Sequence, residues 1–348
     1  MLTDMPLAEL RQYRPEVPEP ADFGEFWAGQ LREARASHSD PSFEPADSAV
    51  RHAGVFDVTF AGYAGDPVKA WLLVPHRGEP GTAVIVEYIG YGGGRGNPFD
   101  WLTWSCAGHP HLVMDLRGQG GGWRSADTAD RGGDGSPSAA GFLTSGIADP
   151  RTYYYTRLFI DAVRAIDAVR AHPAAAGRPL VTAGGSQGGA LAIAAAHLGP
   201  DVAAALPDVP FLAHPRRAVD VTDSRPYREL AEYCRVNPDR AEQAFGTLGY
   251  IDVVNHGRRA AAGRYSRSAS PTTSRRRRRC SPRSTTTQDA RTSPCTRTAG
   301  TRAAAPGTSW PSSPSCTKPG WRNRVPSRAC APAGSRHVSS AVFRSGAA

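Results

Sequence analysis

The stretch that decides the fold is VTAGGSQGGALAIAAAH, residues 181–197. An apolar run enters Gly184-Gly185-Ser186-Gln187-Gly188, which fits the pattern G-x-S-x-G, and small apolar residues continue beyond it. In this pattern a sharp turn between a strand and a helix exposes a serine hydroxyl, and its strained, closely packed backbone demands small neighbours. Taken alone, the letters also suit an ordinary tight turn or a glycine loop that cradles phosphate. The succession of strand, turn and helix favours Ser186 as a nucleophile, with Gly184 and Gly188 as supporting residues.

Apolar runs on either side predict the rest of a sheet. Solid runs suit strands covered on both faces, and they occur at 82–90, 111–118, 179–186 and 202–211. Helical patterns at 153–172 and 188–198 alternate with them. Upstream we expect an amphipathic helix over 23–36 and two antiparallel strands at 55–63 and 68–75. The fold class is therefore α/β, a doubly wound, mostly parallel sheet.

Composition divides the chain near residue 263. From there on, 17 Lys and Arg stand against one acid, with no Leu, Ile or Met, whereas the first 262 residues hold 24 bases and 31 acids. A segment so poor in apolar residues cannot offset chain entropy by burial. We predict an α/β domain over 1–262 and a disordered, Arg/Ser/Thr/Pro-rich tail over 263–348.

Other features of the whole chain exclude several classes. Cys106 and Cys234 are too few for a disulfide framework in the first part, and CxxC metal spacings are absent, so we expect no metal site. The N-terminus lacks an apolar signal-peptide core, and no run of about 18 apolar residues occurs. We therefore expect a cytoplasmic protein without a membrane span.

An acyl-transfer site also needs donors for the oxyanion that develops on the carbonyl oxygen. The backbone N–H of Gln187, directly after the candidate nucleophile, fits the first donor. The strand at 82–90 runs into a glycine-rich turn, so the N–H of Tyr91 is the candidate for the second. An aromatic lid over a glycine turn is an equal alternative for Tyr91. We expect the polar, glycine-rich loop over 118–141 to border the site.

Six stretches together resemble one known family. VEYIGYGGGRG (86–96), DWLTW (100–104), VMDLRGQGGGW (113–123), DPRTYYYTRLFIDAVRA (149–165), AGGSQGG (183–189) and DVPFLAHPRRAV (208–219) look like the acetyl xylan esterase/cephalosporin C deacetylase family of α/β-hydrolases. The resemblance covers about residues 6–255. The family's RGQ signature stands at Arg117-Gly118-Gln119.

The resemblance implies Ser186 as the nucleophile, with Tyr91 and Gln187 as oxyanion donors. Arg117 and Gln119 would brace the turn rather than react. It also implies removal of acetyl groups from sugars and related small esters through an acyl-serine intermediate, without a cofactor. Hexamers are common in the family, although this C-terminus puts a hexamer of this chain in doubt.

The part of the sequence that resembles the family contains neither the acid nor the base of a catalytic triad. In this fold both should lie beyond residue 255, where the family pattern is roughly S-V-G-L-x-D, P-P-S-T-V-F and Y-P-Y-x-x-H-E-G-G. None of it occurs here. Among the later histidines, we interpret His197 as a helix-surface residue and His214 as structural. His256 stands where the match ends, and His337 lies in the tail.

A shifted reading frame explains the loss. When each codon joins the third base of one residue to the first two bases of the next, RSASPTTSRRRRRCS (267–281) permits SVGLPDDVAPPSTVF. Likewise TTTQDARTSPCTRTAGTRAAA (285–305) permits NHYAGREDIAVYPYGGHEGGG. The family pattern returns without a gap, with the aspartate hidden at Thr272 and the histidine at Thr301. We infer a frameshift between His256 and Arg264, so this chain holds neither triad partner and its sheet is incomplete at the C-terminal edge.

Two other hypotheses remain. The run SRRRRRC, residues 274–280, would suit a disordered arm that binds nucleic acid, although the shifted frame already accounts for its arginines and makes this partner unlikely. The chain could also be a catalytically dead scaffold. The sequence leaves open whether the substrate is an acetylated xylo-oligosaccharide, cephalosporin C or another small acetate ester.

Overall fold

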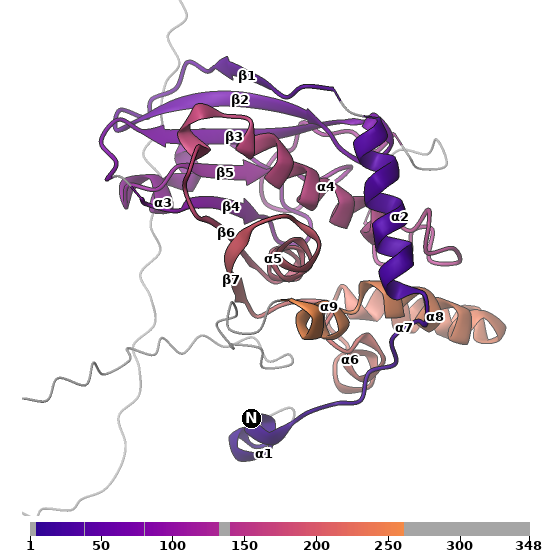
Figure 1. Ribbon diagram of the computed structural model, residues 1–348. Coiled ribbons are helices and arrows are strands. Elements are labelled where there is room, and N and C mark those ends of the chain that lie inside the picture. The colour runs from indigo at the N-terminus through magenta and orange to yellow at the C-terminus, as the bar shows by residue number, and fades with distance from the viewer. Residues whose placement is uncertain (1–4, 38, 80, 132–139, 261–348) are drawn as a thin grey trace, which may run out of the picture. The chain divides into compact units, whose positions relative to one another are not determined.

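A seven-stranded mixed sheet organises the described part of the chain (Figure 1). The computed structural model describes residues 5–37, 39–79, 81–131 and 140–260. The strand order is β1-β2-β3-β5-β4-β6-β7. The strands are β1 (Ser42–Pro45), β2 (Ala53–Ala61), β3 (Pro67–Pro75), β4 (Val84–Tyr88), β5 (His111–Met114), β6 (Leu180–Gly185) and β7 (Val202–Asp208). β1, β2, β3 and β5 pair antiparallel in turn, while β5, β4, β6 and β7 pair in parallel.

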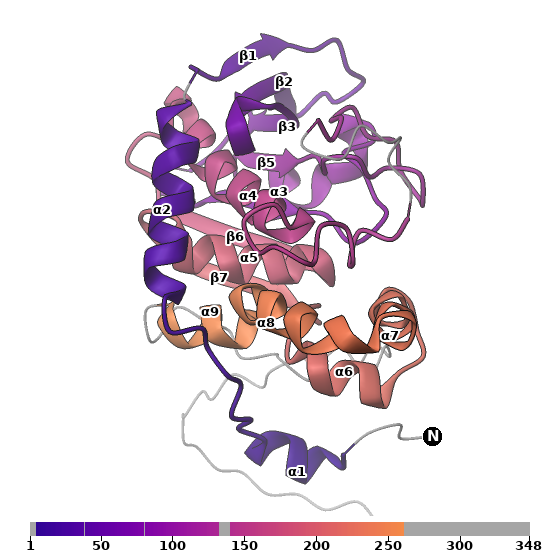
Figure 2. The ribbon, with the colours of Figure 1, turned by 90° about the vertical axis from the view of Figure 1, so that its right-hand side faces the viewer.

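Helices cover the sheet and extend beyond β7. They are α1 (Leu7–Gln12), α2 (Phe23–Ala36), α3 (Leu102–Cys106), α4 (Tyr154–Arg170), α5 (Gln187–Leu198), α6 (Pro215–Val221), α7 (Tyr227–Val236), α8 (Ala241–Ile251) and α9 (Val253–Arg259). Two views agree that α6 to α9 gather past β7, with α9 close to α5 (Figures 1 and 2). Helix α4 packs against β2, β4 and β5, and α5 packs against β4, β6 and β7.

The core follows the two-residue alternation of the strands. In β2 and β3, Val58 and Leu72 face the main core with α2, α4 and α5, whereas Val55 and Leu73 form a smaller cluster with Leu102 of α3. The central parallel strands are buried on both faces: all four residues of β5 and four of the five in β4 are buried. This agrees with the solid apolar runs from which these strands were predicted.

The predicted elements are present. Helix α2 spans the predicted 23–36, and β2, β3, β4, β6, α4 and α5 lie within one or two residues of their predicted ranges. β5 and β7 begin at the predicted residues but end four and three residues earlier than predicted, at Met114 and Asp208. β1, α1, α3 and α6 to α9 were not predicted. The predicted boundary at 262 and the predicted disorder of the tail fall outside the described residues. Within the described ranges, we find no helix that is both long and apolar enough to cross a membrane.

Candidate active site

Ser186 occupies a strained turn between β6 and α5. Its φ of 55° and ψ of −117° match the first central position of a type II′ turn, which normally requires glycine. The backbone N–H of Ser186 donates to Asp208 O (2.9 Å), and its carbonyl accepts from Phe211 N (3.0 Å). These bonds hold the turn against the end of β7. Ser186 is exposed although Gly185 before it is only partly exposed and Gln187 after it is buried, so the turn presents its hydroxyl to solvent.

Two backbone N–H groups near this turn have no hydrogen-bond acceptor among the described residues. Gln187 is the first residue of α5, so its backbone N–H has no carbonyl of a preceding helical turn to which it could donate. Tyr91 N follows β4, the neighbour of β6. A Cβ built on Gly90 would lie 3.6 Å from Gly185 O, so the loop that carries Tyr91 approaches the turn closely. The N-terminus of α5 also favours negative charge at this point.

The Gln187 side chain is held by buried amide and phenol groups. Its Oε1 accepts from Tyr155 Oη (2.9 Å) and from Gln119 Nε2 (3.1 Å), and its Nε2 donates to Ile89 O (3.3 Å). Gln119 Oε1 in turn accepts from Gly92 N (2.7 Å). Gln119 therefore links the first residue of α5 to the loop that carries Tyr91.

The Tyr91 side chain is anchored away from the turn. Its hydroxyl donates to the Glu229 carboxylate of α7 (2.9 Å) and accepts from Gly141 N and Phe142 N (3.3 and 3.2 Å). Burial holds the pKa of the Tyr91 hydroxyl well above its ordinary value, so the phenol stays protonated and keeps donating. The tyrosine thereby fixes its own backbone, while its ring stacks edge-on against Phe142 (5.7 Å between centroids).

Arg117 is fully buried in a cluster of carboxylates. Its guanidinium forms a bidentate pair with Asp161 of α4 (2.6 and 2.8 Å) and reaches Asp66 and Asp130 at 3.3 Å each. Burial opposes the charged guanidinium, but the surrounding carboxylates raise the pKa of Arg117 overall. Gly118 follows with a φ of 66°, which lets the chain reverse immediately after this anchor. All three carboxylate partners lie away from Ser186 along the chain and none bonds to it, so Arg117 fixes the loop.

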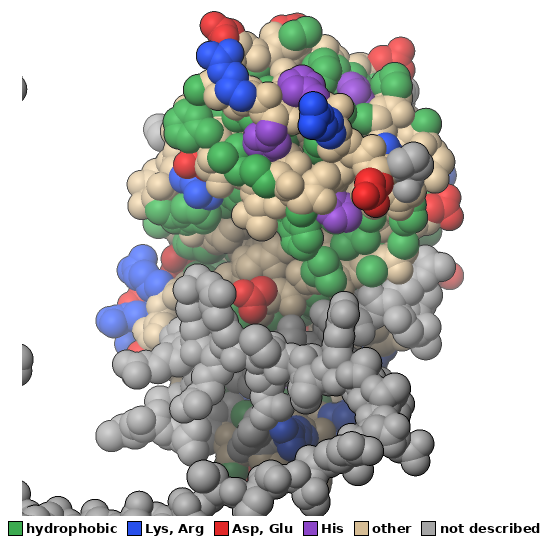
Figure 3. Space-filling view, turned by 90° about the vertical axis from the view of Figure 1, so that its left-hand side faces the viewer, with side chains coloured by type: hydrophobic (Ala, Val, Ile, Leu, Met, Phe, Trp, Pro, Cys, Tyr) green, Lys and Arg blue, Asp and Glu red, His purple; other side chains and the backbone are tan. Residues whose placement is uncertain are grey.

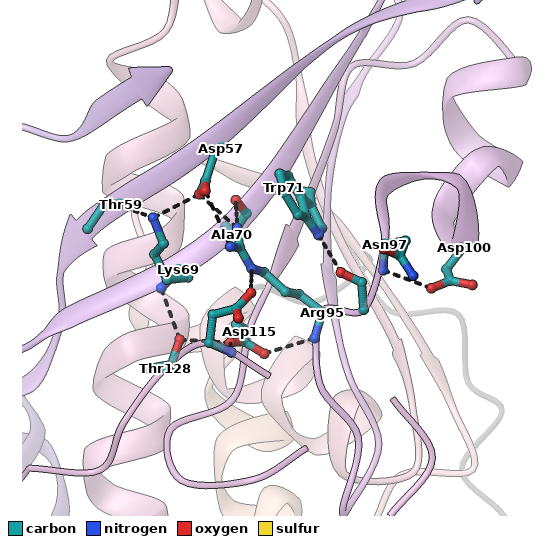
Figure 4. A network of polar contacts seen from close by, with 12 residues as sticks. Asp57, Thr59, Lys69, Ala70, Trp71, Arg95, Asn97, Asp100, Asp115 and Thr128 are labelled. Atoms are coloured by element: carbon teal, nitrogen blue, oxygen red, sulfur yellow. Dashed lines mark hydrogen bonds and ion pairs between the residues drawn. The ribbon is translucent and has the colours of Figure 1, made fainter. Parts of the chain in front are cut away.

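A second polar network fixes the loop after Tyr91 (Figure 4). Asp115 accepts from Arg95 N (2.8 Å), while the Arg95 guanidinium donates to Asp57 Oδ1 (2.8 Å) and Ala70 O (3.0 Å). Burial raises the pKa of the Asp115 carboxyl above its ordinary value, even though the surrounding N–H donors favour the carboxylate. The Arg95 guanidinium also lies over the Trp71 ring at 4.0 Å. The two networks tie the loop after β4 and the described start of the loop after β5 to the sheet.

No histidine ring within the described ranges hydrogen-bonds to the Ser186 hydroxyl. Five histidines adjoin the amino ends of the parallel strands, or strand ends that share that edge, so they lie at the end of the sheet opposite Ser186: His52, His76, His109, His111 and His172. Figure 3 shows histidine side chains gathered on the surface of that end. His214 is bonded to the Tyr13 hydroxyl (2.9 Å), as its structural interpretation leads us to expect.

The last two histidines form a pair far along α5. His197 lies eleven residues after Ser186, or about 16 Å at 1.5 Å per residue. Its Nδ1 lies 3.0 Å from His256 Nδ1, and His256 Nε2 donates to Tyr250 O (3.0 Å). Burial lowers the pKa of both rings and keeps them neutral, so His256 Nδ1 accepts a hydrogen bond from the N–H at His197 Nδ1. His197 was interpreted as a helix-surface residue, but it is half-buried in this pair.

The hidden aspartate at Thr272 and the hidden histidine at Thr301 lie outside the described residues, as does His337. No group of three or more potential metal ligands comes together in the part of the chain that the structure describes.

Comparison with known proteins shows the family to which the chain belongs. Residues 1–265 match the protein-family model described as acetyl xylan esterase (AXE1). The chain belongs to this family. An acetyl xylan esterase from Paenibacillus sp. R4 is 36% identical to it, with a TM-score of 0.67 over 73% of this chain and 81% of that chain. Acetyl xylan esterase 1 from Thermoanaerobacterium sp. JW/SL YS485 is 31% identical, with a TM-score of 0.66 over 74% of this chain and 80% of that chain.

A curated relative of this acetyl xylan esterase family member is longer. Acetyl esterase Axe7A of Xylanibacter ruminicola is 27% identical over 263 residues, covering 71% of this chain and 55% of that protein. The chain thus spans about half of that relative's length. Together with the two solved structures, the mixed sheet and its flanking helices confirm the predicted α/β-hydrolase fold.

Sequence reasoning missed three residues that hold the candidate donors. Tyr155 was visible within the run Tyr153-Tyr154-Tyr155, but its apolar helix pattern gave no sign of a bond to Gln187. Glu229 reaches Tyr91 across 138 positions, so no local signal marks it. Trp123 is the last residue of the family-like stretch 113–123, and nothing in that stretch indicated that its indole N–H donates to Tyr91 O (3.2 Å).

Proposed function

We propose that this family member is a serine esterase that removes O-acetyl groups from acetylated xylo-oligosaccharides, cephalosporin C or similar small esters through an acyl-serine intermediate. One observation carries the proposal: Ser186 exposes its hydroxyl on a strained turn beside the N–H groups of Gln187 and Tyr91, which lack acceptors among the described residues. Membership of the acetyl xylan esterase family supports acetate esters as the substrates.

The chemistry follows from the placement of these groups. Ser186 Oγ attacks the acetyl carbonyl carbon as its proton passes to a base, and the carbonyl oxygen becomes an oxyanion. The Gln187 and Tyr91 N–H groups donate to that oxygen, where a single donor is worth about 10²- to 10³-fold in kcat. Collapse expels the alcohol, which takes the proton from the base. Water then attacks the acetyl-serine in the same way and releases acetate.

The base is where this chain departs from the proposed chemistry. No histidine of the described segments reaches Ser186, and Thr272 and Thr301 stand where the restored frame places aspartate and histidine. A threonine hydroxyl does not accept a proton at neutral pH. By comparison with other triads, we expect the loss to lower kcat by about 10⁴-fold or more.

The contacts of α9 support a frame break late in the interval between His256 and Arg264. Arg258 donates to Val17 O (3.1 Å) and Pro15 O (2.7 Å), and Arg259 pairs with Glu19 (3.0 Å). Ala260 is buried and its N–H closes the helix on His256 O (3.0 Å). We propose that the break lies after Ala260.

Covalent trapping tests the proposed nucleophile. A frame-restored chain mixed with p-nitrophenyl acetate should release p-nitrophenol in a burst, and peptide mapping should find the acetyl group on Ser186. Ser186→Ala should abolish both signals. An acetyl group on another residue, with turnover retained in Ser186→Ala, would overturn the mechanism. The non-catalytic scaffold predicts no burst from either chain. The hexamer and the cytoplasmic location stay predictions.

A further inference from the structure

An exposed tryptophan stands at the rim of the Ser186 turn. Trp123 lies in the loop after β5 and is 52% exposed. Its indole N–H donates to Tyr91 O (3.2 Å). A Cβ built on Gly90 would lie 3.8 Å from the Trp123 ring and 3.6 Å from Gly185 O. The ring and the residue before Ser186 therefore flank the same glycine.

The ring is held in place although half of it is open to solvent. A Cβ on Gly93 would lie 2.4 Å from Cζ2 of Trp123, so the indole fills the space that any side chain at this position would take. The Arg124 guanidinium lies 4.9 Å from the Trp123 ring and 4.3 Å from the Trp101 ring, and it pairs with Asp100 at 3.6 Å. A fixed aromatic surface loses little conformational entropy when a ligand covers it.

We propose that Trp123 is a platform on which the sugar ring of an acetylated substrate stacks. The inference rests on the proposed esterase function. A pyranose ring has one apolar face of C–H groups and a rim of hydroxyls. The indole suits that face, and the Arg124 guanidinium beside it can donate hydrogen bonds to the hydroxyls. A simple alkyl ester has no hydroxyls to accept those bonds.

Binding to the full chain tests the platform without requiring turnover. Acetylated xylotriose is titrated into the parent, Trp123→Ala, Trp123→Phe and Trp104→Ala, with affinity followed by saturation-transfer NMR. Trp104 is the matched control, because it is a tryptophan of α3, which packs against β3 rather than beside Ser186. Covering half of an indole should be worth about tenfold in Kd, so Trp123→Ala should bind about tenfold more weakly. Trp123→Phe should lie between, and Trp104→Ala should match the parent. Unaltered affinity in Trp123→Ala, or no binding by the parent, would overturn the proposal.

Kinetics of the frame-restored chain separate substrate recognition from a general defect. Because Trp123 also bonds Tyr91 O, Trp123→Ala can lower kcat/KM for every ester, but the loss for acetylated xylotriose should exceed the loss for ethyl acetate by about tenfold. An equal loss on both esters would show a structural role and defeat the platform. If the parent hydrolyses neither ester yet binds the sugar through Trp123, the esterase proposal fails while the platform stands.

Discussion

Gly184 and Gly188 at the two ends of the turn should tolerate no side chain, whereas Gly185 should tolerate one. A Cβ on Gly188 would lie 2.0 Å from Tyr88 O and 2.7 Å from Tyr88 C, and one on Gly184 would lie 2.5 Å from Gly188 O. Tyr88 pairs with Gly184 in the β4–β6 register, so its carbonyl cannot rotate away. In contrast, nothing lies within 4 Å of a Cβ on Gly185.

The expected cost follows from this contact. Gly188→Ala forces α5 and β4 apart by more than an ångström, so we expect the upper end of the overpacking range, about 3 kcal/mol. At about 2–4 °C per kcal/mol for a domain of this size, Tm should fall by roughly 6–12 °C. Gly185→Ala is the matched control and should leave Tm within about 2 °C of the parent.

Thermal and urea unfolding of the full chain, followed by far-UV circular dichroism, measures both variants. The reasoning predicts that Gly188→Ala and Gly184→Ala lose stability while Gly185→Ala does not. Equal stability of Gly188→Ala and Gly185→Ala would refute the close approach of helix and strand on which the turn depends.

Three further outcomes follow from the same contacts. Because Ser186 holds a φ of 55° and a ψ of −117°, Ser186→Gly should be more stable than Ser186→Ala by about 1–3 kcal/mol in urea unfolding, and a tie would contradict the strain. Burial lowers the folded-state pKa of His197 to about 4 and of His256 to about 3, against about 6.5 unfolded. Stability is therefore full above pH 6.5 and is lost as pH falls toward 4, since only the unfolded chain then takes up protons. His256→Asn should flatten that slope by up to about 1.4 kcal/mol per pH unit, while an unchanged slope would exclude the pair as its source. In the frame-restored chain, Tyr155→Phe removes a hydrogen bond to Gln187 and should lower kcat about fivefold at constant KM, whereas a raised KM alone would contradict a role in oxyanion binding.

Short sequence patterns predicted the elements whose packing is decided by residues that are close together in the chain. The stripe of Phe23, Phe26, Trp27 and Leu31 placed α2, and all four side chains are buried. The letters Gly184 to Gly188 placed the turn, because its steric demands act on adjacent residues and so show in a short pattern.

The anchors of the site were beyond sequence reasoning for a different reason. Glu229 meets Tyr91 only after α7 folds back past β7, and α7 is a short helix whose polar residues mask its apolar stripe. His197 was interpreted as a surface residue because its partner, His256, lies 59 positions away. Contacts of this kind arise from the packing of whole elements, which a single sequence does not encode locally.

The direct test of the central claim compares initial rates of p-nitrophenyl acetate hydrolysis by three chains: the printed sequence, the frame-restored sequence, and the frame-restored sequence with alanine at position 301. The third chain separates loss of the base from loss of the missing part of the sheet. We predict that the frame-restored chain alone is fast and that the other two are slower by about 10⁴-fold. A printed chain as fast as the frame-restored one would contradict the claim that Ser186 has lost its proton acceptor.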